Sequence, residues 1–429
     1  MSIENLYEIF KKYPEITTDT RKCTSGSIFF ALKGANFNGN QYAAKAIELG
    51  CSYAVVDEQE YATLPNIILV DNSLKTLQEL ATFHRRKFKI PVIAITGTNG
   101  KTTTKELVTS VLSQEHNIIS TQGNFNNHIG VPLTLLKMTK KHEIAIIEMG
   151  ANHRGEIESL CEIAQPDFGL ITNIGHAHIE GFGSFENIVK AKGELYDYIR
   201  YTEGKVFVNY DNPVLRDMAD GLTALYYGTE GKSHDFVTGE FVSANPYLEF
   251  RWKFVSTYHT IKTHLIGGYN LANAMAAIAI GKYFGIKGKL ISKALEEYEP
   301  TNNRSQLKDS ERNMLIVDAY NANPTSMLAA LENFSQMEVS KKTLILGDMK
   351  ELGIDSIAEH QKIVNYIEDQ AFKNVLLVGE EFNHTKNNFH CFATLDELKD
   401  YLSKNPVTDS YVLLKGSRSM RLEDCVELL

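Results

Sequence analysis

The chain has 429 residues, of which 43% are hydrophobic and 23% are charged, and these proportions are ordinary for a folded globular protein. Its length exceeds what one hydrophobic core usually organises, so about three domains are expected at ~150 residues each. The formal charge of −9 argues against nucleic acid as the main partner, because a polyanion is bound by a basic surface.

The first 88 residues alternate short apolar runs with helical patterns. Strands are predicted at 27–32, 53–56 and 67–70, and helices at 42–49 and 74–88. This alternation predicts a small α/β domain over residues 1–88, which ends in the basic cluster His84-Arg85-Arg86-Lys87.

An apolar, β-branched run at 92–96 then breaks into a glycine turn, and residues 103–112 can continue as a helix. The turn reads Gly97-Thr98-Asn99-Gly100-Lys101-Thr102-Thr103. Its glycines allow successive backbone N–H groups to face an anion at the positive end of the helix. Lys101 adds a cation for the outer phosphates, and the hydroxyl of Thr102 suits Mg²⁺. The stretch therefore predicts a nucleoside triphosphate site.

The usual phosphate-loop spacing does not fit, because Ile95 occupies the position of the first glycine and leaves the shorter pattern G-x-x-G-K-T. The alternative is a tight turn with a solvated lysine. A strand, a turn and a helix in the right order favour the phosphate site over that alternative.

The strands predicted after the glycine turn become polar at their carboxyl ends. Glu148 follows the run at 144–147, Asn173 follows the run at 168–171, and Asn209 follows the run at 206–208. Since ligands bind at the carboxyl ends of parallel strands, these side chains should converge on the phosphate loop in a central domain over 89–300. Residues 235–265 are typical of antiparallel hairpins, and an alanine-rich helix is expected from 269.

A new strand series begins after residue 300, with runs at 314–317, 343–346, 375–378 and 411–414 separated by helical patterns. This predicts a doubly wound, Rossmann-like domain over 301–429. The expected fold is therefore α/β, with a small N-terminal domain, a central phosphate-loop domain built on a parallel sheet, and this C-terminal domain.

Several polar residues have two interpretations from the sequence. Glu148 could hold Mg²⁺ or be a surface glutamate at a strand end. His178 could be a ligand or a solvated loop side chain, and Lys192 lies with Lys190 and Glu194 on a helix whose charged face could simply be solvated. The loop at 124–132 could be a turn or a site for a sugar or phosphate.

No apolar run approaches the ~18 residues of a membrane-spanning helix, and the N-terminus lacks the basic and apolar regions of a signal peptide. The five cysteines contain no C-x-x-C pair and are expected to be reduced thiols. We therefore expect a cytoplasmic protein without membrane insertion.

Taken together, these motifs resemble the Mur ligase family, whose members form amides at the expense of ATP in peptidoglycan precursor synthesis. The phosphate loop looks like the shortened loop of that family, which accounts for Ile95. Within the family, four strings are similar to the members that add D-alanyl-D-alanine: residues 123–134, 149–157, 318–324 and 346–353. The resemblance covers nearly the whole chain.

The resemblance implies roles that spacing could not provide. ATP would be bound by the loop from Gly97 to Thr103, with Asn270 and Asn273 near the adenine, Arg304 at the phosphates and Asp318 at the ribose. Two Mg²⁺ ions are implied, held by Thr102, Glu148, His178 and a carbamylated Lys192. Lys101, Glu148, His178 and Lys192 would be the catalytic set.

The implied substrates are ATP, UDP-N-acetylmuramoyl-tripeptide and D-Ala-D-Ala, and the implied protein is a monomer. The resemblance assigns the substrate to Thr20, Arg21, Asn126, Asn127, His153, Arg154, Tyr320 and Asn321. One departure affects the first domain: where the family commonly has Asp-Gly-His, this chain has Asn38-Gly39-Asn40. This leaves the nucleotide-sugar contacts less defined than the ATP site.

Two other functions stay open from the sequence. The chain could be a ligase of the same family with another amine acceptor, such as the one that adds the third residue of the stem peptide or a folylpolyglutamate-type enzyme. It could also be a regulatory protein that hydrolyses ATP without forming an amide, although the resemblance extends over all three regions and not only the phosphate loop.

Overall fold

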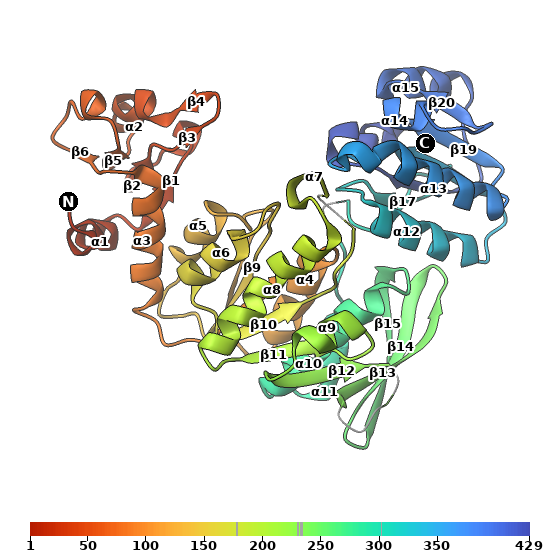
Figure 1. The fold of residues 1–429 in the computed structure, drawn as a ribbon, viewed down its shortest axis with the longest axis horizontal. Helices are drawn as coiled ribbons and strands as arrows, with labels where there is room; N and C mark the ends of the chain where they lie inside the picture. Colours follow the sequence, from red (N-terminus) through yellow and green to blue (C-terminus); the bar gives the residue numbers. More distant parts are fainter. Residues whose placement is uncertain (177–178, 230, 232–234, 302) are drawn as a thin grey trace.

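The computed structural model describes residues 1–429 except 177–178, 230, 232–234 and 302. Three α/β units follow one another along the chain, each with its own main sheet (Figure 1). This is the mixed α/β architecture that the sequence predicts. Within the described residues, every helix is too short or too polar to cross a bilayer.

The first unit is a four-stranded parallel sheet with the order β1-β2-β5-β6. Its strands are β1 (Glu15–Thr17), β2 (Ser27–Phe30), β5 (Tyr53–Val56) and β6 (Ile67–Leu69). A small hairpin of β3 (Lys33–Gly34) and β4 (Phe37–Asn38) leaves the sheet, and the helices are α1 (Ile3–Lys12), α2 (Ala43–Glu48) and α3 (Ser73–Arg85).

Helix α3 joins the first unit to the second. It packs against α1 on one side and against α5 (Gly130–Leu135) and α6 (Glu156–Ala164) on another. At its C-terminal end, the His84 ring is 2.9 Å from the carbonyl oxygen of Met138, and Arg85 donates to the carbonyl of Ala164. The basic cluster that the sequence places at a domain boundary is therefore partly buried between the two units.

The central sheet has nine strands in the order β15-β14-β13-β12-β11-β10-β7-β9-β8. Its strands are β7 (Val92–Thr96), β8 (Ile118–Ser120), β9 (Ile144–Glu148), β10 (Phe168–Ile171), β11 (Lys205–Asn209), β12 (Thr223–Gly228), β13 (Asp235–Ala244), β14 (Tyr247–Phe254) and β15 (Thr257–Ile266). The predicted hairpins are confirmed, since β14 is antiparallel to both of its neighbours. β13 also pairs in parallel with β12, so the hairpins extend the sheet.

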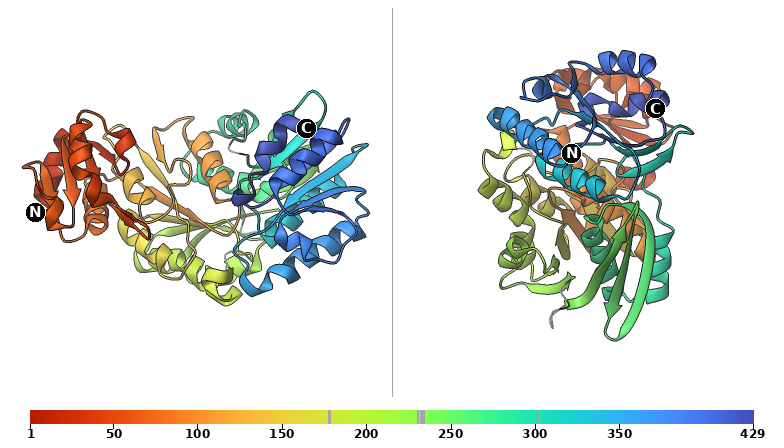
Figure 2. Two further views of the ribbon diagram at one scale, coloured as in Figure 1. Left: turned by 90° about the horizontal axis from the view of Figure 1, so that it is seen from above. Right: turned by 90° about the vertical axis from the view of Figure 1, so that its right-hand side faces the viewer.

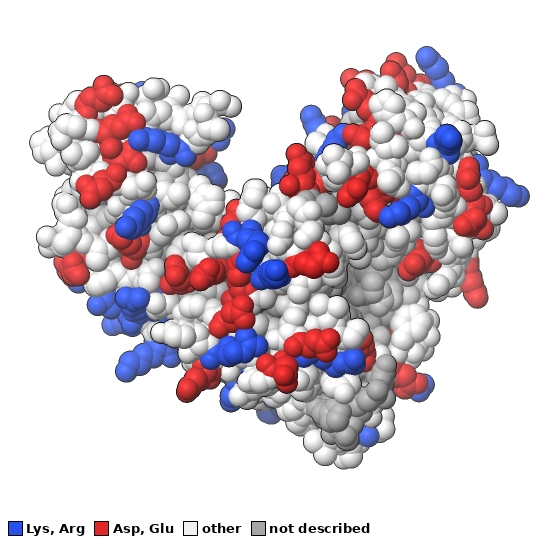
Figure 3. Space-filling model, viewed as in Figure 1, with Lys and Arg blue, Asp and Glu red and all other residues white. Residues whose placement is uncertain are grey.

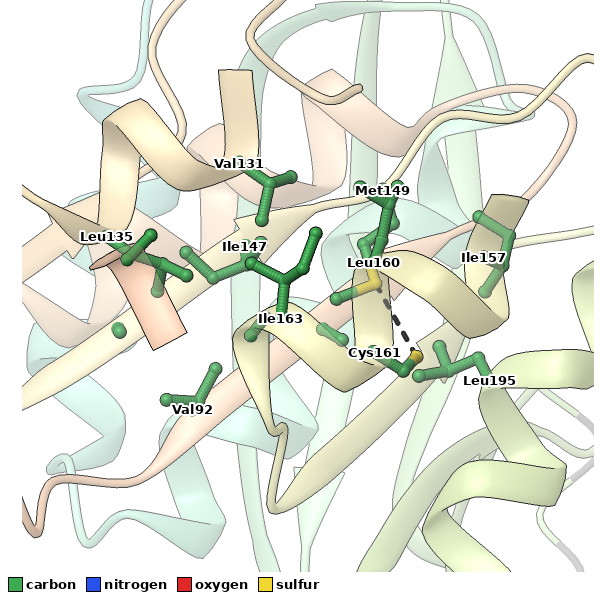
Figure 4. Packing of buried hydrophobic residues seen from close by; sticks show 14 of the residues in the cluster. Val92, Val131, Leu135, Ile147, Met149, Ile157, Leu160, Cys161, Ile163 and Leu195 are labelled. Atoms are coloured by element: carbon green, nitrogen blue, oxygen red, sulfur yellow. Dashed lines mark hydrogen bonds between the residues drawn. The ribbon is translucent and has the colours of Figure 1, made fainter. Parts of the chain in front are cut away.

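Strand β7 is an interior strand of this sheet, parallel to its neighbours β9 and β10, and it is buried on both faces. Ile93 and Ile95 pack under α4 (Lys101–Leu112) and α10 (Asn270–Tyr283), whereas Val92 and Ala94 face the opposite layer of α5, α6 and α8 (Phe185–Tyr201). Figure 4 shows this second layer, where the Cys161 thiol lies 3.8 Å from the sulfur of Met149. Burial on both faces explains why the strand is apolar at every position.

The third unit has a six-stranded sheet with the order β16-β17-β21-β18-β19-β20, parallel except for β16. Its strands are β16 (Gln306–Asp309), β17 (Met314–Asp318), β18 (Lys342–Gly347), β19 (Asn374–Val378), β20 (His390–Phe392) and β21 (Tyr411–Lys415). Helices α12 (Pro324–Gln336) and α13 (Ser356–Asp369) cover one face, and α15 (Leu395–Lys404) covers the other (Figure 2). The predicted doubly wound arrangement is confirmed.

A wide notch separates the first unit from the third, and the second unit forms its floor (Figure 3). Acidic and basic side chains are interspersed over the face shown there. The carboxyl ends of β7, β9 and β10 belong to the unit that forms this floor.

Candidate active site

A cavity of about 1100 Å³ lies between the second and third units at the carboxyl ends of their parallel strands. Sixteen of the residues predicted from the sequence line it: Thr98, Asn99, Gly100, Lys101, Thr102, Thr103, Asn126, Asn127, Glu148, Arg154, Asn270, Asn273, Arg304, Asp318, Tyr320 and Asn321. The convergence expected from the polar strand ends is therefore present.

The other predicted residues lie elsewhere. Gly97 directly precedes the lining loop, and Lys192 lies behind the wall, where its Nζ donates to the carbonyl of Ala151 over 3.3 Å. His153 is exposed and paired with Glu156 at 3.7 Å. Thr20 and Arg21 belong to the first unit and do not line the cavity. His178 lies outside the described residues.

The phosphate loop has the backbone that its glycines allow. Gly97 has φ 142° and Gly100 has φ 77°, and α4 begins at Lys101, directly after the second glycine. A Cβ on Gly97 would lie 2.0 Å from Oγ1 of Thr172, so only glycine fits there. The tip of β10 also holds the loop, since Asn173 accepts from the backbone N–H of Asn99 at 3.0 Å. This scaffolding role of β10 depends on strand order, which the sequence does not reveal.

Lys101 is folded back onto its own loop. Its Nζ donates to the carbonyl oxygens of Gly97 at 2.8 Å and Thr98 at 3.0 Å. Burial lowers the pKa of Lys101, the charge of Glu148 opposes this effect, and Arg304 adds to it. An anion bound at the loop would favour the charged form and compete for the ammonium group.

Glu148 is buried at the end of β9 with 1% of its surface exposed. Its Oε1 accepts from the side chain of Asn126 at 2.7 Å, whereas Oε2 is buried and has no hydrogen-bond partner among the described residues. A buried carboxylate oxygen without a donor is costly unless a cation is near it. This unpaired oxygen fits a Mg²⁺ ligand better than a surface glutamate.

Lys192 is buried, with 3% of its surface exposed, and its Nζ lies 5.3 Å from the ring centre of Phe182. Burial and the neighbouring charge of Lys101 lower the pKa of Lys192 to about 7. The interpretation as a solvated side chain is therefore wrong for Lys192, although it is correct for Lys190, which is exposed. Glu194, on the same helix, caps α6: its carboxylate accepts from two backbone N–H groups at the start of that helix, at 2.7 and 3.1 Å.

Asn270 and Asn273 lie at the start of α10, next to the phosphate loop. Asn273 donates to Oδ1 of Asn270 at 2.8 Å and accepts from Thr104 of α4 at 3.1 Å. A Cβ on Gly100 would lie 2.7 Å from Oδ1 of Asn273, so the asparagine is packed directly on the loop. The two amides bond to each other, Asn273 also bonds to α4, and Asn270 donates to the carbonyl of Ile266, which gives them a scaffolding role that the sequence motif did not indicate.

The third unit contributes a group of charged side chains around the end of β17. Asp318 accepts from the backbone N–H of Ser305 at 3.1 Å and from the ammonium of Lys415, which is 2% exposed. The guanidinium carbon of Arg304 lies 3.7 Å from the ring centre of Tyr320. The sequence places Lys415 at a strand end, but only the β17–β21 pairing shows that it faces Asp318.

Among the described residues, no cluster of three His, Cys, Asp or Glu side chains is placed to hold a metal by itself. The predicted metal set instead combines the carboxylate of Glu148, the hydroxyl of Thr102 and Lys192 with His178, which lies outside the described residues. Thr102 is 3% exposed in the first turn of α4, which follows β7, and β7 is parallel to β9, so Thr102 and Glu148 lie at the same end of the sheet.

Comparison with known proteins identifies the family. Three family models match in sequence order: the Mur ligase family catalytic domain at 12–91, the Mur ligase middle domain at 95–281, and the Mur ligase glutamate ligase domain at 303–418. The chain is 34% identical over 438 aligned residues to the UDP-N-acetylmuramoyl-tripeptide--D-alanyl-D-alanine ligase of Bacillus subtilis, covering 96% of this chain and 92% of that protein. The chain belongs to the Mur ligase family.

Solved structures agree with this identification. A crystal structure of MurF from Acinetobacter baumannii is 30% identical and superposes with a TM-score of 0.88 over 99% of this chain and 97% of that one. The MurF ligase of Thermotoga maritima in complex with ADP is 25% identical, with a TM-score of 0.86 and coverage of 96% of both chains. The resemblance expected from the motifs is therefore confirmed over the whole fold.

The two asparagines that depart from the family pattern, Asn38 and Asn40, bond to other side chains of the first unit. Asn40 is fully buried, and its side chain donates to Asp57 at 2.8 Å and to Asn38 at 3.0 Å. Asn38 donates in turn to Glu58 at 3.0 Å. Both asparagines thus hold the β3–β4 hairpin against the end of β5. Arg21 points to solvent and pairs with Asp19 at 2.8 Å.

Proposed function

We propose that this Mur ligase joins D-Ala-D-Ala to UDP-N-acetylmuramoyl-tripeptide at the expense of ATP, in peptidoglycan precursor synthesis. The observation that carries the proposal is one cavity in which the phosphate loop and Glu148 face Arg304 and Asp318 of the third unit. Near-complete alignment with relatives that carry this ligase name supports the choice of reaction.

The chemistry explains why such a cavity is needed. A peptide carboxylate is a poor acyl donor, so the γ-phosphoryl group of ATP is first transferred to it, which forms an acyl phosphate and releases ADP. The amine of D-Ala-D-Ala then attacks the acyl carbon, and phosphate leaves. Phosphoryl transfer mainly requires positioning and neutralisation of charge. Lys101 and Arg304 supply positive charge on opposite walls of the cavity.

The residues present fit Mg²⁺, which the family implies at two sites. Thr102, Glu148 and a carbamylated Lys192 would hold the ions, together with His178, which lies outside the described residues. When bound, Mg²⁺ neutralises the oxygens of the triphosphate and of the peptide carboxylate. The unpaired Oε2 of Glu148 supports this assignment.

The lowered pKa of Lys192 supports a carbamate at this residue. An amine with a pKa of about 7 is substantially neutral near neutral pH. Its nitrogen can then attack CO₂, forming an N–C bond and losing a proton, so that a cation becomes a carboxylate. This change would remove the repulsion between Lys192 and Lys101 and supply a second carboxylate, besides Glu148, as a metal ligand.

The substrate would extend from the first unit along the notch of Figure 3 to the cavity. In this arrangement Thr20 and Arg21 bind the uridine diphosphate end. The peptide and the D-Ala-D-Ala acceptor are bound by Asn126, Asn127, His153, Arg154, Tyr320 and Asn321. The proposed domains are 1–88, 89–300 and 301–429, and the enzyme would act in the cytoplasm as a monomer.

The decisive experiment measures ADP release and amide formation by the purified chain with ATP, Mg²⁺ and UDP-N-acetylmuramoyl-tripeptide, first without and then with D-Ala-D-Ala. We expect amide to form only with all components, one ADP per amide. Preference for another acceptor in an amine panel would indicate a different ligase of the family. Phosphate release that is independent of both the nucleotide tripeptide and the acceptor would contradict ligase function.

A further inference from the structure

Two asparagine side chains connect the phosphate loop to the third unit. Asn323 donates from Nδ2 to Oδ1 of Asn99 at 2.8 Å, and Asn99 donates from Nδ2 to Oδ1 of Asn323 at 3.4 Å. The two residues are 224 positions apart in the chain. Both line the cavity, and Asn323 is 8% exposed. The pair therefore bridges the two walls of the proposed ATP site.

On the Asn99 side of this bridge, hydrogen bonds hold the backbone. Its backbone N–H donates to the side chain of Asn173 at 3.0 Å, and its carbonyl accepts from Thr172 at 2.6 Å and from Asn173 at 3.0 Å. The tip of β10 thus holds the backbone of Asn99 from both sides. This position of the backbone places the carboxamide of Asn99 within reach of Asn323.

The Asn323 side is also fixed, because this residue caps α12. Its Oδ1 accepts from the backbone N–H of Ser326 at 2.9 Å, and its own N–H donates to the Ser326 hydroxyl at 3.1 Å. Serine or aspartate could cap the helix about equally well, and threonine nearly as well. Among these capping residues only asparagine adds a side-chain N–H donor, and that donor binds Asn99. The bridge, and not the cap, accounts for asparagine at this position.

A second contact comes from the same turn of α12. The hydroxyl of Thr325 accepts from the backbone N–H of His176 at 3.2 Å. The first turn of α12 is therefore attached to two loops of the central unit, one after β7 and one after β10. Since Asp318 lies five positions before Asn323 on the same connection, this attachment sets where Asp318 lies relative to Lys101.

We propose that Asn323 is a positioning residue, which aligns the third unit on the phosphate loop and keeps the cavity closed during the reaction. This inference rests on the proposed ligase function. Acyl phosphates are hydrolysed by water, so a loosened wall should allow hydrolysis to compete with attack by D-Ala-D-Ala. The residue itself makes no bond to the reacting atoms.

The test uses Asn323→Ser, which keeps a capping oxygen and removes the bridge. We expect amide turnover to fall about tenfold, as for the loss of one or two hydrogen bonds, and the ADP released per amide to rise above one. KM for ATP should change much less than kcat. Asn72→Ser is the matched control, because Asn72 caps α3 through Lys75 at 2.8 Å, far from the cavity. It should behave as the wild type.

A double variant tests whether the two side chains act together. Asn99→Ala should also slow turnover, and adding Asn323→Ser should cause little further loss, because the bridge is already broken. If the two losses multiply, the residues act independently and the bridge is not the cause. Equal turnover and equal ADP per amide in Asn323→Ser and Asn72→Ser would also overturn the proposal.

A measurement without turnover separates this inference from the proposed function. Small-angle scattering with a non-hydrolysable ATP analogue should give a larger radius of gyration for Asn323→Ser than for the wild type and Asn72→Ser. If the wild type forms no amide, the proposed function fails, while the scattering result still tests the bridge. Identical radii in all three proteins would show that the bridge does not hold the units together.

Discussion

At the scale of single residues, the two lysines that the sequence predicts to be catalytic have different environments. Lys101 is bonded to carbonyl oxygens of its own loop, and Lys192 is enclosed behind the cavity wall. Both have a pKa that burial lowers, and the charge of Lys101 lowers the pKa of Lys192 further. An anion bound at the phosphate loop would favour the charged form of Lys101. A carbamate would instead replace the positive charge of Lys192, so the two lysines are expected to respond to different bound groups.

Lys101→Ala should lose at least ~10² in turnover, by analogy with the removal of one charge-stabilising donor from an active site. The physical reason is that Lys415, the other lysine among the described residues that line the cavity, is bonded to Asp318 of the third unit. Steady-state kinetics of amide formation measures the effect. Lys89→Ala, an exposed lysine just before β7, serves as the control. Near-normal turnover in Lys101→Ala would contradict the assignment.

Lys192→Ala should be inactive, and short carboxylic acids should partly rescue it by supplying the missing carboxylate. In the wild type, only the neutral amine reacts with CO₂, and the pKa of Lys192 is lowered to about 7. At pH 6 the neutral fraction falls to about a tenth, so turnover at fixed CO₂ should decline as pH falls from 8 to 6. Rates measured against pH and CO₂ test this.

Lys190→Ala is the matched control for Lys192, because it lies on the same helix and is exposed. It should retain activity and the pH dependence of the wild type. Full activity of Lys192→Ala without any added carboxylate would show that no carbamate is needed.

At the scale of elements, two separate features of the phosphate loop require glycine: a backbone with positive φ and a neighbouring atom too close for a Cβ. Gly100→Ala meets both, because φ is 77° and Oδ1 of Asn273 would lie 2.7 Å from the new Cβ. Gly221→Ala meets only the first, with φ 75° and open space. We expect Gly221→Ala to lose about 1–2 kcal/mol of unfolding free energy from backbone strain, and Gly100→Ala to lose more.

Chemical denaturation of both glycine variants and calorimetric titration with ATP measure the difference. ATP affinity should fall only in Gly100→Ala, since displacement of Asn273 would disturb the loop. Equal stability losses together with unchanged ATP affinity in both variants would contradict the packing argument.

The elements themselves were predicted well where local pattern decides them. The apolar run at 92–96, the glycine turn and the helix after it are β7, the loop and α4, although α4 begins at Lys101 and not at 103. Glu148 was correctly expected at a strand end. Partners from distant segments could not be predicted, such as Asn323 for Asn99 or Lys415 for Asp318. These contacts depend on strand order and on how two units meet, and neither leaves a local signal.

At the scale of the whole molecule, the connection between the second and third units contains strained backbone and is bonded to α4. Asn303 and Ser305 have φ values of 55° and 47°, which non-glycine residues rarely adopt. Before them, the Tyr298 hydroxyl donates to Glu106 of α4 at 2.5 Å. The strain lies on either side of Arg304, so movement at this connection would displace Arg304 relative to the phosphate loop.

The units also differ in how far they depend on one another, which predicts the behaviour of fragments. The third unit has its own six-stranded sheet, with a helical layer and an apolar cluster on each face, so residues 301–429 should unfold cooperatively as an isolated fragment. Residues 1–88 should not, because α3 also packs on α5 and α6, and Arg85 would lose the carbonyl of Ala164. Thermal unfolding followed by circular dichroism tests both fragments against the full chain. A sharp transition for 1–88, or none for 301–429, would show that these units depend on their neighbours in the opposite way.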